Sequence, residues 1–258
     1  MTASGAHSNA GLFDIADRVA CVTGASGGIG RAAASALVAA GARVIGVARR
    51  RDRLAIWQQE ADGQTAIVVA DLANKEVLSD VVNEVAAPFG NPEILINAAG
   101  INTRQVADDV TVDDWNRTID LNLATPFFLA QALAPAMKEN GWGRILNFAS
   151  LQSRRAFKGG LSYGASKGGV EQMTRAMAEA WSSHGITVNA LAPGFFPTEL
   201  TEPVFADRAL AAQYANQTCI GRNGVLSDLI GPILFFCSDA SGYVTGQTLF
   251  VDGGFTAK

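Results

Sequence analysis

The residues best suited to chemistry lie in one short segment, SYGASKGGVEQMTR, residues 162–175. Tyr163 and Lys167 are four positions apart, so a helix here places them on one face. An ammonium beside a phenol favours the tyrosinate and lowers the pKa of the phenol. A phenol tuned in this way can exchange a proton with a carbonyl or alcohol oxygen. Ser150, thirteen residues before Tyr163, ends the apolar run RILNFAS and adds a hydroxyl near the same place.

The same segment carries glycine at positions 164, 168 and 169. Glycine disfavours a helix by about 1 kcal/mol relative to alanine, so packing must compensate for it. We expect the bare surface around Tyr163 and Lys167 to admit the cofactor or another helix, including one from a second subunit.

A second segment able to bind a ligand is TGASGGIG, residues 23–30, between an apolar run and a helical pattern. Gly24, Gly28 and Gly30 give the spacing G-x-x-x-G-x-G. Glycines at a strand–helix junction allow the backbone to approach a diphosphate, and the helix N-terminus attracts its negative charge. The segment therefore predicts a dinucleotide site.

The next apolar run ends in VARRRDR, residues 47–53. An acidic residue at this point usually binds the ribose 2′-hydroxyl of NAD, whereas arginine accommodates the 2′-phosphate of NADP. Here Ala48 is followed by Arg49, which suits a phosphate because a guanidinium can form two parallel hydrogen bonds. We predict that NADP(H) is preferred at Arg49 and that NAD(H) remains possible.

These segments belong to a regular alternation of short apolar runs and helical patterns. Runs that are apolar on both faces are typical of parallel strands covered by helices on both sides, and strict alternation with helices predicts a doubly wound sheet. We therefore predict an α/β, single-domain Rossmann-type fold with about seven parallel strands, preceded by a flexible leader over 1–12 and occupying 13–258. The expected strands are 18–24, 43–48, 65–71, 93–100, 144–150, 186–194 and 246–254; the main helices begin near 28, 74, 111, 162 and 225.

Composition excludes several function classes. The net charge of −4 gives no general attraction to nucleic acid, and no apolar run is long enough to span a membrane. The three cysteines and two histidines lack the spacing of a disulfide framework or a metal site. We expect a cytoplasmic protein without a metal.

The turn motif T-G-x-x-x-G-x-G resembles that of the short-chain dehydrogenase/reductase family, and the resemblance extends over about residues 14–254. The resemblance implies a catalytic set of Asn122, Ser150, Tyr163 and Lys167. In that family Tyr163 would be the general acid/base, Lys167 would lower its pKa and hold the nicotinamide ribose, and Ser150 would bind the substrate oxygen. Asn122 would hold a water that links Lys167 to solvent.

The resemblance also implies the residues that bind the cofactor. Asp71 would meet the adenine, the segment NAAG at 97–100 would support the sheet near the adenosine ribose, and Thr198 in PGFFPTEL would contact the carboxamide or a phosphate. The full expected set is Gly24, Ser26, Gly28, Ile29, Gly30, Arg49, Asp71, Leu72, Asn97, Ala98, Gly100, Tyr163, Lys167, Pro193, Gly194, Phe196 and Thr198.

The substrate is the least determined feature. Arg104, Ser153, Arg154 and Phe195 lie in loops expected beside the nicotinamide, and arginine suits a carboxylate. The segments SLQS and PGFFPTELT resemble the gluconate 5-dehydrogenase and deoxyketogluconate dehydrogenase branch of the family, which implies a sugar acid or polyol. A 3-oxoacyl-carrier-protein reductase, another small carbonyl or alcohol substrate, and a non-catalytic nucleotide-binding regulator remain alternatives. A homo-oligomer, tetramer or dimer, is the habit of the family.

Overall fold

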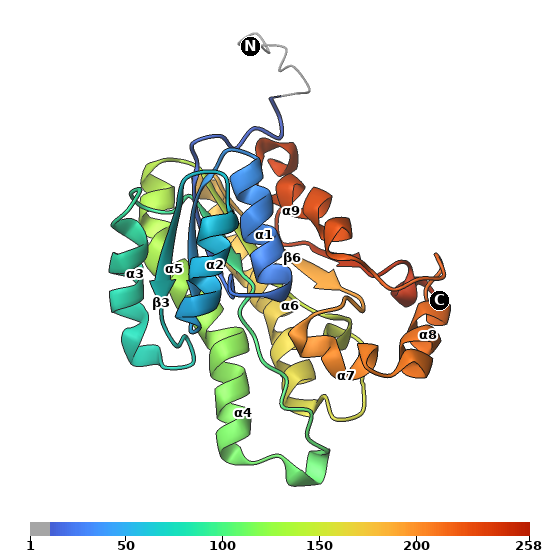
Figure 1. Ribbon diagram of the computed structural model, residues 1–258. Coiled ribbons are helices and arrows are strands. Elements are labelled where there is room, and N and C mark those ends of the chain that lie inside the picture. The colour runs from blue at the N-terminus through green and yellow to red at the C-terminus, as the bar shows by residue number, and fades with distance from the viewer. Residues whose placement is uncertain (1–10) are drawn as a thin grey trace.

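The computed structural model describes residues 11–258, which form a seven-stranded parallel sheet covered by helices on both faces (Figure 1). The strand order β3-β2-β1-β4-β5-β6-β7 confirms the predicted doubly wound α/β fold. The strands are β1 Val19–Thr23, β2 Arg43–Ala48, β3 Thr65–Val69, β4 Ile94–Asn97, β5 Gly143–Phe148, β6 Ile186–Pro193 and β7 Thr248–Val251. The central strands are buried along their whole length, as their continuous apolar runs require.

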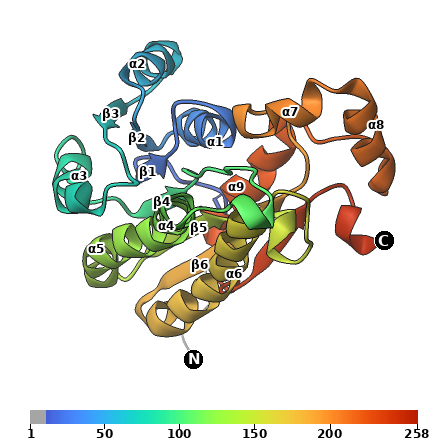
Figure 2. The ribbon, with the colours of Figure 1, turned by 90° about the horizontal axis from the view of Figure 1, so that it is seen from below.

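The helices form two layers. Viewed from below, the sheet separates α1 and α9 from α5 and α6 (Figure 2); α2 joins the first layer and α3 the second. The bounds are α1 Gly28–Ala39, α2 Arg51–Glu60, α3 Leu78–Ala86, α4 Val112–Ile119, α5 Thr125–Glu139, α6 Leu161–Trp181, α7 Glu202–Phe205, α8 Arg208–Gln217 and α9 Ile230–Phe236.

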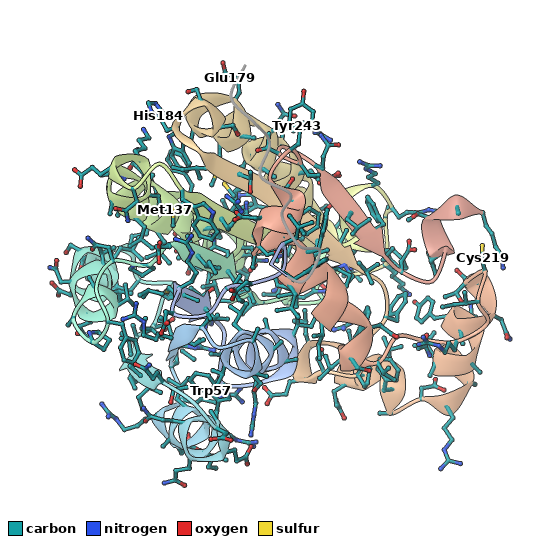
Figure 3. All side chains as sticks on the ribbon, turned by 90° about the horizontal axis from the view of Figure 1, so that it is seen from above. Trp57, Met137, Glu179, His184, Cys219 and Tyr243 are labelled. Atoms are coloured by element: carbon teal, nitrogen blue, oxygen red, sulfur yellow. The ribbon has the colours of Figure 1, made fainter. Side chains whose placement is uncertain are left out.

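Each face of the sheet has its own apolar core. Trp57 of α2 lies in the core shared with α1 and α9, whereas Met137 of α5 lies in the core shared with α3 and α6 (Figure 3). Both side chains are almost completely buried. Removing large apolar side chains from water is the main driving force for this arrangement, and it fixes the sheet that carries the functional loops.

The loops that could bind a ligand meet at the carboxyl ends of the strands. The strand order reverses direction between β1 and β4, because β1 continues to β2 on one side while β4 continues to β5 on the other. A crevice at such a switch point is where open α/β sheets bind ligands. The glycine-rich turn after β1 and the segment 98–104 after β4 flank this point.

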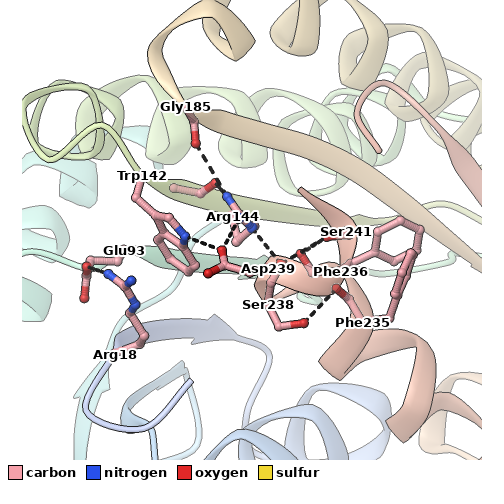
Figure 4. A network of polar contacts seen from close by, with 11 residues as sticks. Arg18, Glu93, Trp142, Arg144, Gly185, Phe235, Phe236, Ser238, Asp239 and Ser241 are labelled. Atoms are coloured by element: carbon pink, nitrogen blue, oxygen red, sulfur yellow. Dashed lines mark hydrogen bonds and ion pairs between the residues drawn. The ribbon is translucent and has the colours of Figure 1, made fainter. Parts of the chain in front are cut away.

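The opposite end of the sheet is fastened by a polar network (Figure 4). Arg144 at the start of β5 is 3% exposed and donates to the Ser238 carbonyl at 2.9 Å and to Asp239 Oδ1 at 2.7 Å. The Trp142 ring lies between the guanidinium groups of Arg18 and Arg144, at 3.9 and 4.3 Å from its centroid. Burial lowers the pKa of Arg144, yet its hydrogen bonds join β5 to the segment that follows α9.

The predicted leader falls almost entirely outside the described residues, which begin at Gly11. Within them, the Leu12 carbonyl already accepts a hydrogen bond from the Ala240 amide at 2.8 Å, which fastens this point of the chain to the domain. Among residues 11–258, no helix combines the length and apolarity needed to cross a bilayer.

Candidate active site

Helix α6 carries the two residues on which the sequence argument began. Tyr163 and Lys167 share one face of α6 and are 8% and 5% exposed. Lys167 Nζ donates to the Phe148 carbonyl at 2.6 Å and lies 5.6 Å from the centroid of the Tyr163 ring. The lysine is thus held between the end of β5 and the tyrosine.

The glycines of α6 have a local packing role. A Cβ at Gly169 would approach the Leu123 side chain to 2.8 Å, and one at Gly164 would lie 3.4 Å from the Gln152 carbonyl. The turn at 151–153 and the segment before α5 therefore cover this part of the helix. Close packing at these glycines is thus provided within the chain, and the predicted approach of the cofactor or of a second subunit stays a prediction.

Ser150 lies two residues after the end of β5, with its side chain beside Tyr163. Its hydroxyl accepts a hydrogen bond from the Gln152 amide at 3.1 Å, and its side-chain hydrogen bond with Tyr163 is one of the influences that lower the tyrosine pKa. The Ser153 hydroxyl accepts from the Ser150 amide at 3.3 Å and donates to the Lys167 carbonyl at 2.8 Å. Ser153 ties the Ser150 turn to α6, and it does not line the cleft where we expected it to meet substrate.

Burial dominates the electrostatics of Tyr163 and Lys167. Burial raises the pKa of Tyr163, and the Ser150 hydrogen bond and the positive charge of Arg104 act against that rise. Burial also lowers the pKa of Lys167 to about 8. Burial therefore has the largest influence on the phenol, and the effect of Lys167 on the pKa of Tyr163 stays a prediction.

Asn122 lies in a π-helical turn, Asp120–Ala124, between α4 and α5, and its side chain is buried. Its amide nitrogen donates to the Ile101 carbonyl and to Ser166 Oγ, at 2.9 and 3.1 Å, and its oxygen accepts from the Ile101 amide at 2.9 Å. Asn122 therefore fastens α6 to the loop after β4. It does not line the cleft, and its part in a water relay stays a prediction.

The glycine-rich turn has the shape that a diphosphate site needs. Gly24 has φ of +73°, and a Cβ there would lie 2.9 Å from the Ala98 backbone. A Cβ at Gly30 would come within 2.4 Å of the Gly24 carbonyl oxygen. Only glycine fits both positions, so the bare backbone and the start of α1 face the cleft.

Two arginines lie at the end of β2. Arg49 Nη1 is 3.8 Å from Asp71 Oδ2, and both side chains are about half exposed. Arg50 reaches farther over the turn: its Nη2 donates to Ser26 Oγ at 3.1 Å, and its Nη1 donates to both Glu199 carboxylate oxygens. Of these two residues, we predicted only Arg49 to bind the cofactor. The sequence alone does not distinguish consecutive arginines, because the contact that sets Arg50 apart is made with Glu199, which is distant in sequence.

These elements enclose one cleft of about 600 Å³. The structure brings most of the predicted site residues to its wall. They are Gly24, Ser26, Gly28, Ile29, Gly30, Arg49, Asp71, Leu72, Ala98, Gly100, Arg104, Ser150, Tyr163, Lys167, Pro193, Gly194, Phe195, Phe196 and Thr198.

Two other predicted residues lie outside the wall. Asn97 is buried at the end of β4, where its amide donates to Asn147 Oδ1 at 2.9 Å and joins two strands. Arg154 turns away because its Nη2 pairs at 2.8 Å with Glu171, a nearly buried carboxylate of α6. Asn97 thus supports the sheet as predicted, and its contact with the cofactor stays a prediction; Arg154 does not line the cleft where we expected it to meet substrate.

The substrate end of the cleft combines one arginine with an aromatic wall. Arg104 has φ of +54°, which is uncommon for a residue with a side chain, and its Nη2 donates to the Leu200 carbonyl at 2.6 Å. Phe195 stacks on Tyr214 with centroids 3.9 Å apart, and Phe157 packs edge-on against both. Phe157 and Tyr214 were not predicted from the sequence, since isolated aromatic residues carry no spacing signal.

Known proteins resemble this chain over nearly its whole length. The family model described as enoyl-(acyl carrier protein) reductase matches residues 24–256. Gluconate 5-dehydrogenase of Gluconobacter oxydans (strain 621H) is 38% identical over 250 residues, which cover 96% of this chain and 98% of that protein. The 2-dehydro-3-deoxy-D-gluconate 5-dehydrogenase of Escherichia coli (strain K12) is 38% identical over 251 residues, covering 95% and 98%.

A solved structure agrees with these relatives. The crystal structure of a gluconate 5-dehydrogenase from Burkholderia cenocepacia J2315, in complex with NADP and tartrate, has a TM-score of 0.90 and 36% identity. The comparison covers 96% of this chain and 98% of that chain. The likeness therefore extends over nearly the whole of both chains.

Proposed function

Because this chain belongs to the short-chain dehydrogenase/reductase family, we propose that it is an NADP(H)-dependent oxidoreductase that interconverts a keto group and a hydroxyl on a sugar acid or polyol. One observation carries the proposal: a single cleft joins the glycine-rich turn and its arginines to Tyr163, Ser150 and Arg104. The turn suits a diphosphate, and the two hydroxyls suit a carbonyl oxygen.

Several groups of this chain fit a phosphorylated dinucleotide. The bare backbone at Gly24 and Gly30 leaves room for the diphosphate. Arg50 and Arg49 supply guanidinium groups for a 2′-phosphate, and the Lys167 ammonium lies where it can bind ribose hydroxyls. When bound, the nicotinamide supplies or accepts the hydride. NADP in the Burkholderia cenocepacia relative supports the preference for the phosphorylated form.

Tyr163 is the proposed proton donor and acceptor. In reduction its phenol gives a proton to the carbonyl oxygen, while the Ser150 hydroxyl donates a hydrogen bond to the same atom. The raised pKa keeps Tyr163 protonated near neutral pH, which suits this direction. In oxidation the tyrosinate must accept the proton, so the rate of oxidation should rise toward alkaline pH.

The substrate class follows from the far end of the cleft. Arg104 can exchange its hydrogen bond to the Leu200 carbonyl for a charged one to a carboxylate. The stacked Phe195 and Tyr214 rings offer an apolar face to the C–H bonds of a carbon chain. The names of the similar gluconate dehydrogenases agree with an acidic, hydroxylated substrate.

The alternative is a 3-oxoacyl thioester carried by an acidic carrier protein, which is supported by the name of a relative from Salmonella typhimurium, a 3-oxoacyl-[acyl-carrier-protein] reductase that is 34% identical over 237 residues. A spectrophotometric assay of NADPH consumption with 5-ketogluconate, other keto sugar acids, neutral ketones and an acyl thioester distinguishes the two. Greater efficiency with the thioester would overturn the sugar-acid assignment. Binding of NADPH without turnover of any carbonyl would favour a non-catalytic regulator.

Tyr163→Phe tests the catalytic role. General acid catalysis contributes roughly 10²- to 10⁴-fold, so kcat should fall by at least about 100-fold while NADPH affinity, measured by fluorescence titration, stays within about twofold. Tyr243→Phe is the matched control, because Tyr243 is fully exposed. Comparable turnover by both variants would remove Tyr163 from the mechanism.

We also propose a cytoplasmic homo-oligomer, tetramer or dimer. The strand β7 forms one edge of the sheet and leaves Leu249 42% exposed, which supports burial against another copy. Light scattering of the purified protein tests the assembly, and a monomer at micromolar concentration would contradict it.

A further inference from the structure

An ion pair crosses the cofactor end of the cleft. Arg50 follows β2, and Glu199 lies in the cover segment, defined here as residues 198–205 after β6. Arg50 Nη1 donates to Glu199 Oε1 at 2.9 Å and to Oε2 at 2.8 Å. A Cβ placed on Gly27 would lie 3.2 Å from Arg50 Nη2 and 3.4 Å from Glu199 Oε1. The pair therefore lies directly over the glycine-rich turn.

In this structure the guanidinium of Arg50 already donates hydrogen bonds to two residues, Ser26 and Glu199. Its Nε and Nη2 donate to Ser26 Oγ at 3.4 and 3.1 Å, while Nη1 serves Glu199. A 2′-phosphate at the end of β2 needs these same donors. The Glu199 carboxylate and a phosphate carry charge of the same sign, so one displaces the other.

We propose, on the premise that the proposed function is correct, that Glu199 is a cofactor-discriminating residue of this enzyme. Its carboxylate occupies Arg50 until a 2′-phosphate displaces it. NADP(H) thereby detaches the cover segment from the glycine-rich turn, whereas NAD(H) leaves the ion pair intact. Glu199 reduces affinity for NADP(H) and leaves affinity for NAD(H) nearly unchanged.

The cover segment is held at a second point, which limits how far it moves. Arg104 Nη2 donates to the carbonyl of Leu200, the residue after Glu199. Displacement of Glu199 therefore releases the cover segment from Arg50 first. The hydrogen bond between Arg104 and the Leu200 carbonyl keeps the segment attached until a ligand binds Arg104. The exchange at Arg50 should thus be visible with the dinucleotide alone.

The expected size of the effect follows from exposure. The side chains of Arg50 and Glu199 are 43% and 61% exposed, and exposed ion pairs of this kind shift an equilibrium by up to about fivefold. Glu199→Gln should therefore tighten NADPH binding about two- to fivefold and change NADH binding by less than about 1.5-fold. The gain should shrink at high salt, because screening weakens the competing pair.

Fluorescence titration of NADPH and NADH tests this with the full-length protein. Glu202→Gln is the matched control, because it removes one negative charge from the same segment at an exposed position. The expected result is a gain for NADPH in E199Q alone, and no further gain when E199Q is added to Arg50→Met. Equal changes for both dinucleotides, weaker NADPH binding, or the same gain in E202Q would overturn the proposal.

Hydrogen exchange on the protein without ligand gives an independent readout. E199Q should speed the hydrogen exchange of the amides in 198–205, while E202Q leaves their exchange unchanged. Unaltered exchange in E199Q would contradict the proposal that the Arg50–Glu199 ion pair holds the cover segment. If the wild type bound neither dinucleotide, the proposed function would fail together with this inference. Normal binding without discrimination by E199Q would reject the inference alone.

Discussion

Replacement of Arg104 should separate acidic from neutral substrates. Arg104→Asn is the suitable change, because asparagine tolerates the left-handed backbone, φ +54°, that Arg104 adopts. A hydrogen bond to a charged group contributes about 1.5–3 kcal/mol, and about 1.4 kcal/mol corresponds to a tenfold change. We therefore expect kcat/KM for a keto sugar acid to fall about 10- to 150-fold.

The same variant should change the pH dependence. The positive charge of Arg104 lowers the pKa of Tyr163, so its removal lets burial raise that pKa further. Less tyrosinate is then present at any given pH, and the alkaline rise of the oxidation rate moves to higher pH. Reduction, which uses the protonated phenol, should keep its rate near neutral pH with a neutral ketone.

The assay compares a keto sugar acid with a neutral ketose of equal chain length, in the wild type and in Arg104→Asn. Arg155→Asn is the matched control: its Nη2 donates to the Lys258 carbonyl, outside the wall of the cleft. A loss that is equal for acidic and neutral substrates, or equal in the two variants, would refute carboxylate recognition by Arg104.

Three further predictions concern the turn, the lysine and the far end of the sheet. Gly30→Ala places a Cβ 2.4 Å from the Gly24 carbonyl and should weaken NADPH binding at least about tenfold, whereas Gly231→Ala, in open space, should not. Lys167→Met should abolish turnover yet raise the free energy of unfolding at neutral pH by up to ~3 kcal/mol. Burial moves the pKa of Lys167 from 10.5 to about 8, so in urea titrations the difference should shrink as pH rises from about 8 to 10.5. Arg144→Met should lower the free energy of unfolding by about 2–4 kcal/mol without changing kcat of the folded enzyme.

Local spacing accounts for what the sequence predicted well. The relation of Tyr163 to Lys167 is fixed by one helical turn, and the glycines of the β1–α1 turn are fixed by steric contacts within a few residues. Both features follow from backbone geometry alone. The alternation of apolar runs determined the sheet for the same reason, because burial on both faces leaves few other arrangements.

Partners distant in sequence explain what could not be predicted. Arg154 has the right residue type in the right loop, but the nearly buried Glu171 of α6 takes its guanidinium. Arg50 differs from Arg49 because it pairs with Glu199, which is 149 residues away. The raised pKa of Tyr163 depends on how completely the folded chain excludes water from the phenol, and no spacing rule contains that information.

The carboxyl ends of the strands carry the groups proposed for catalysis, whereas the polar network at the amino ends contributes to stability. At the carboxyl ends, the buried ammonium of Lys167 and the left-handed backbone of Arg104 each oppose folding, since one loses hydration and the other is sterically disfavoured. At the amino ends, Arg144 is also buried, but its donors bind the Gly143 and Ser238 carbonyls and Asp239. These hydrogen bonds lie outside the wall of the cleft, so a ligand in the cleft does not compete for the Arg144 guanidinium. The reactive cleft therefore keeps groups that a substrate can still engage, and the network around Arg144 helps to offset the stability that those groups remove.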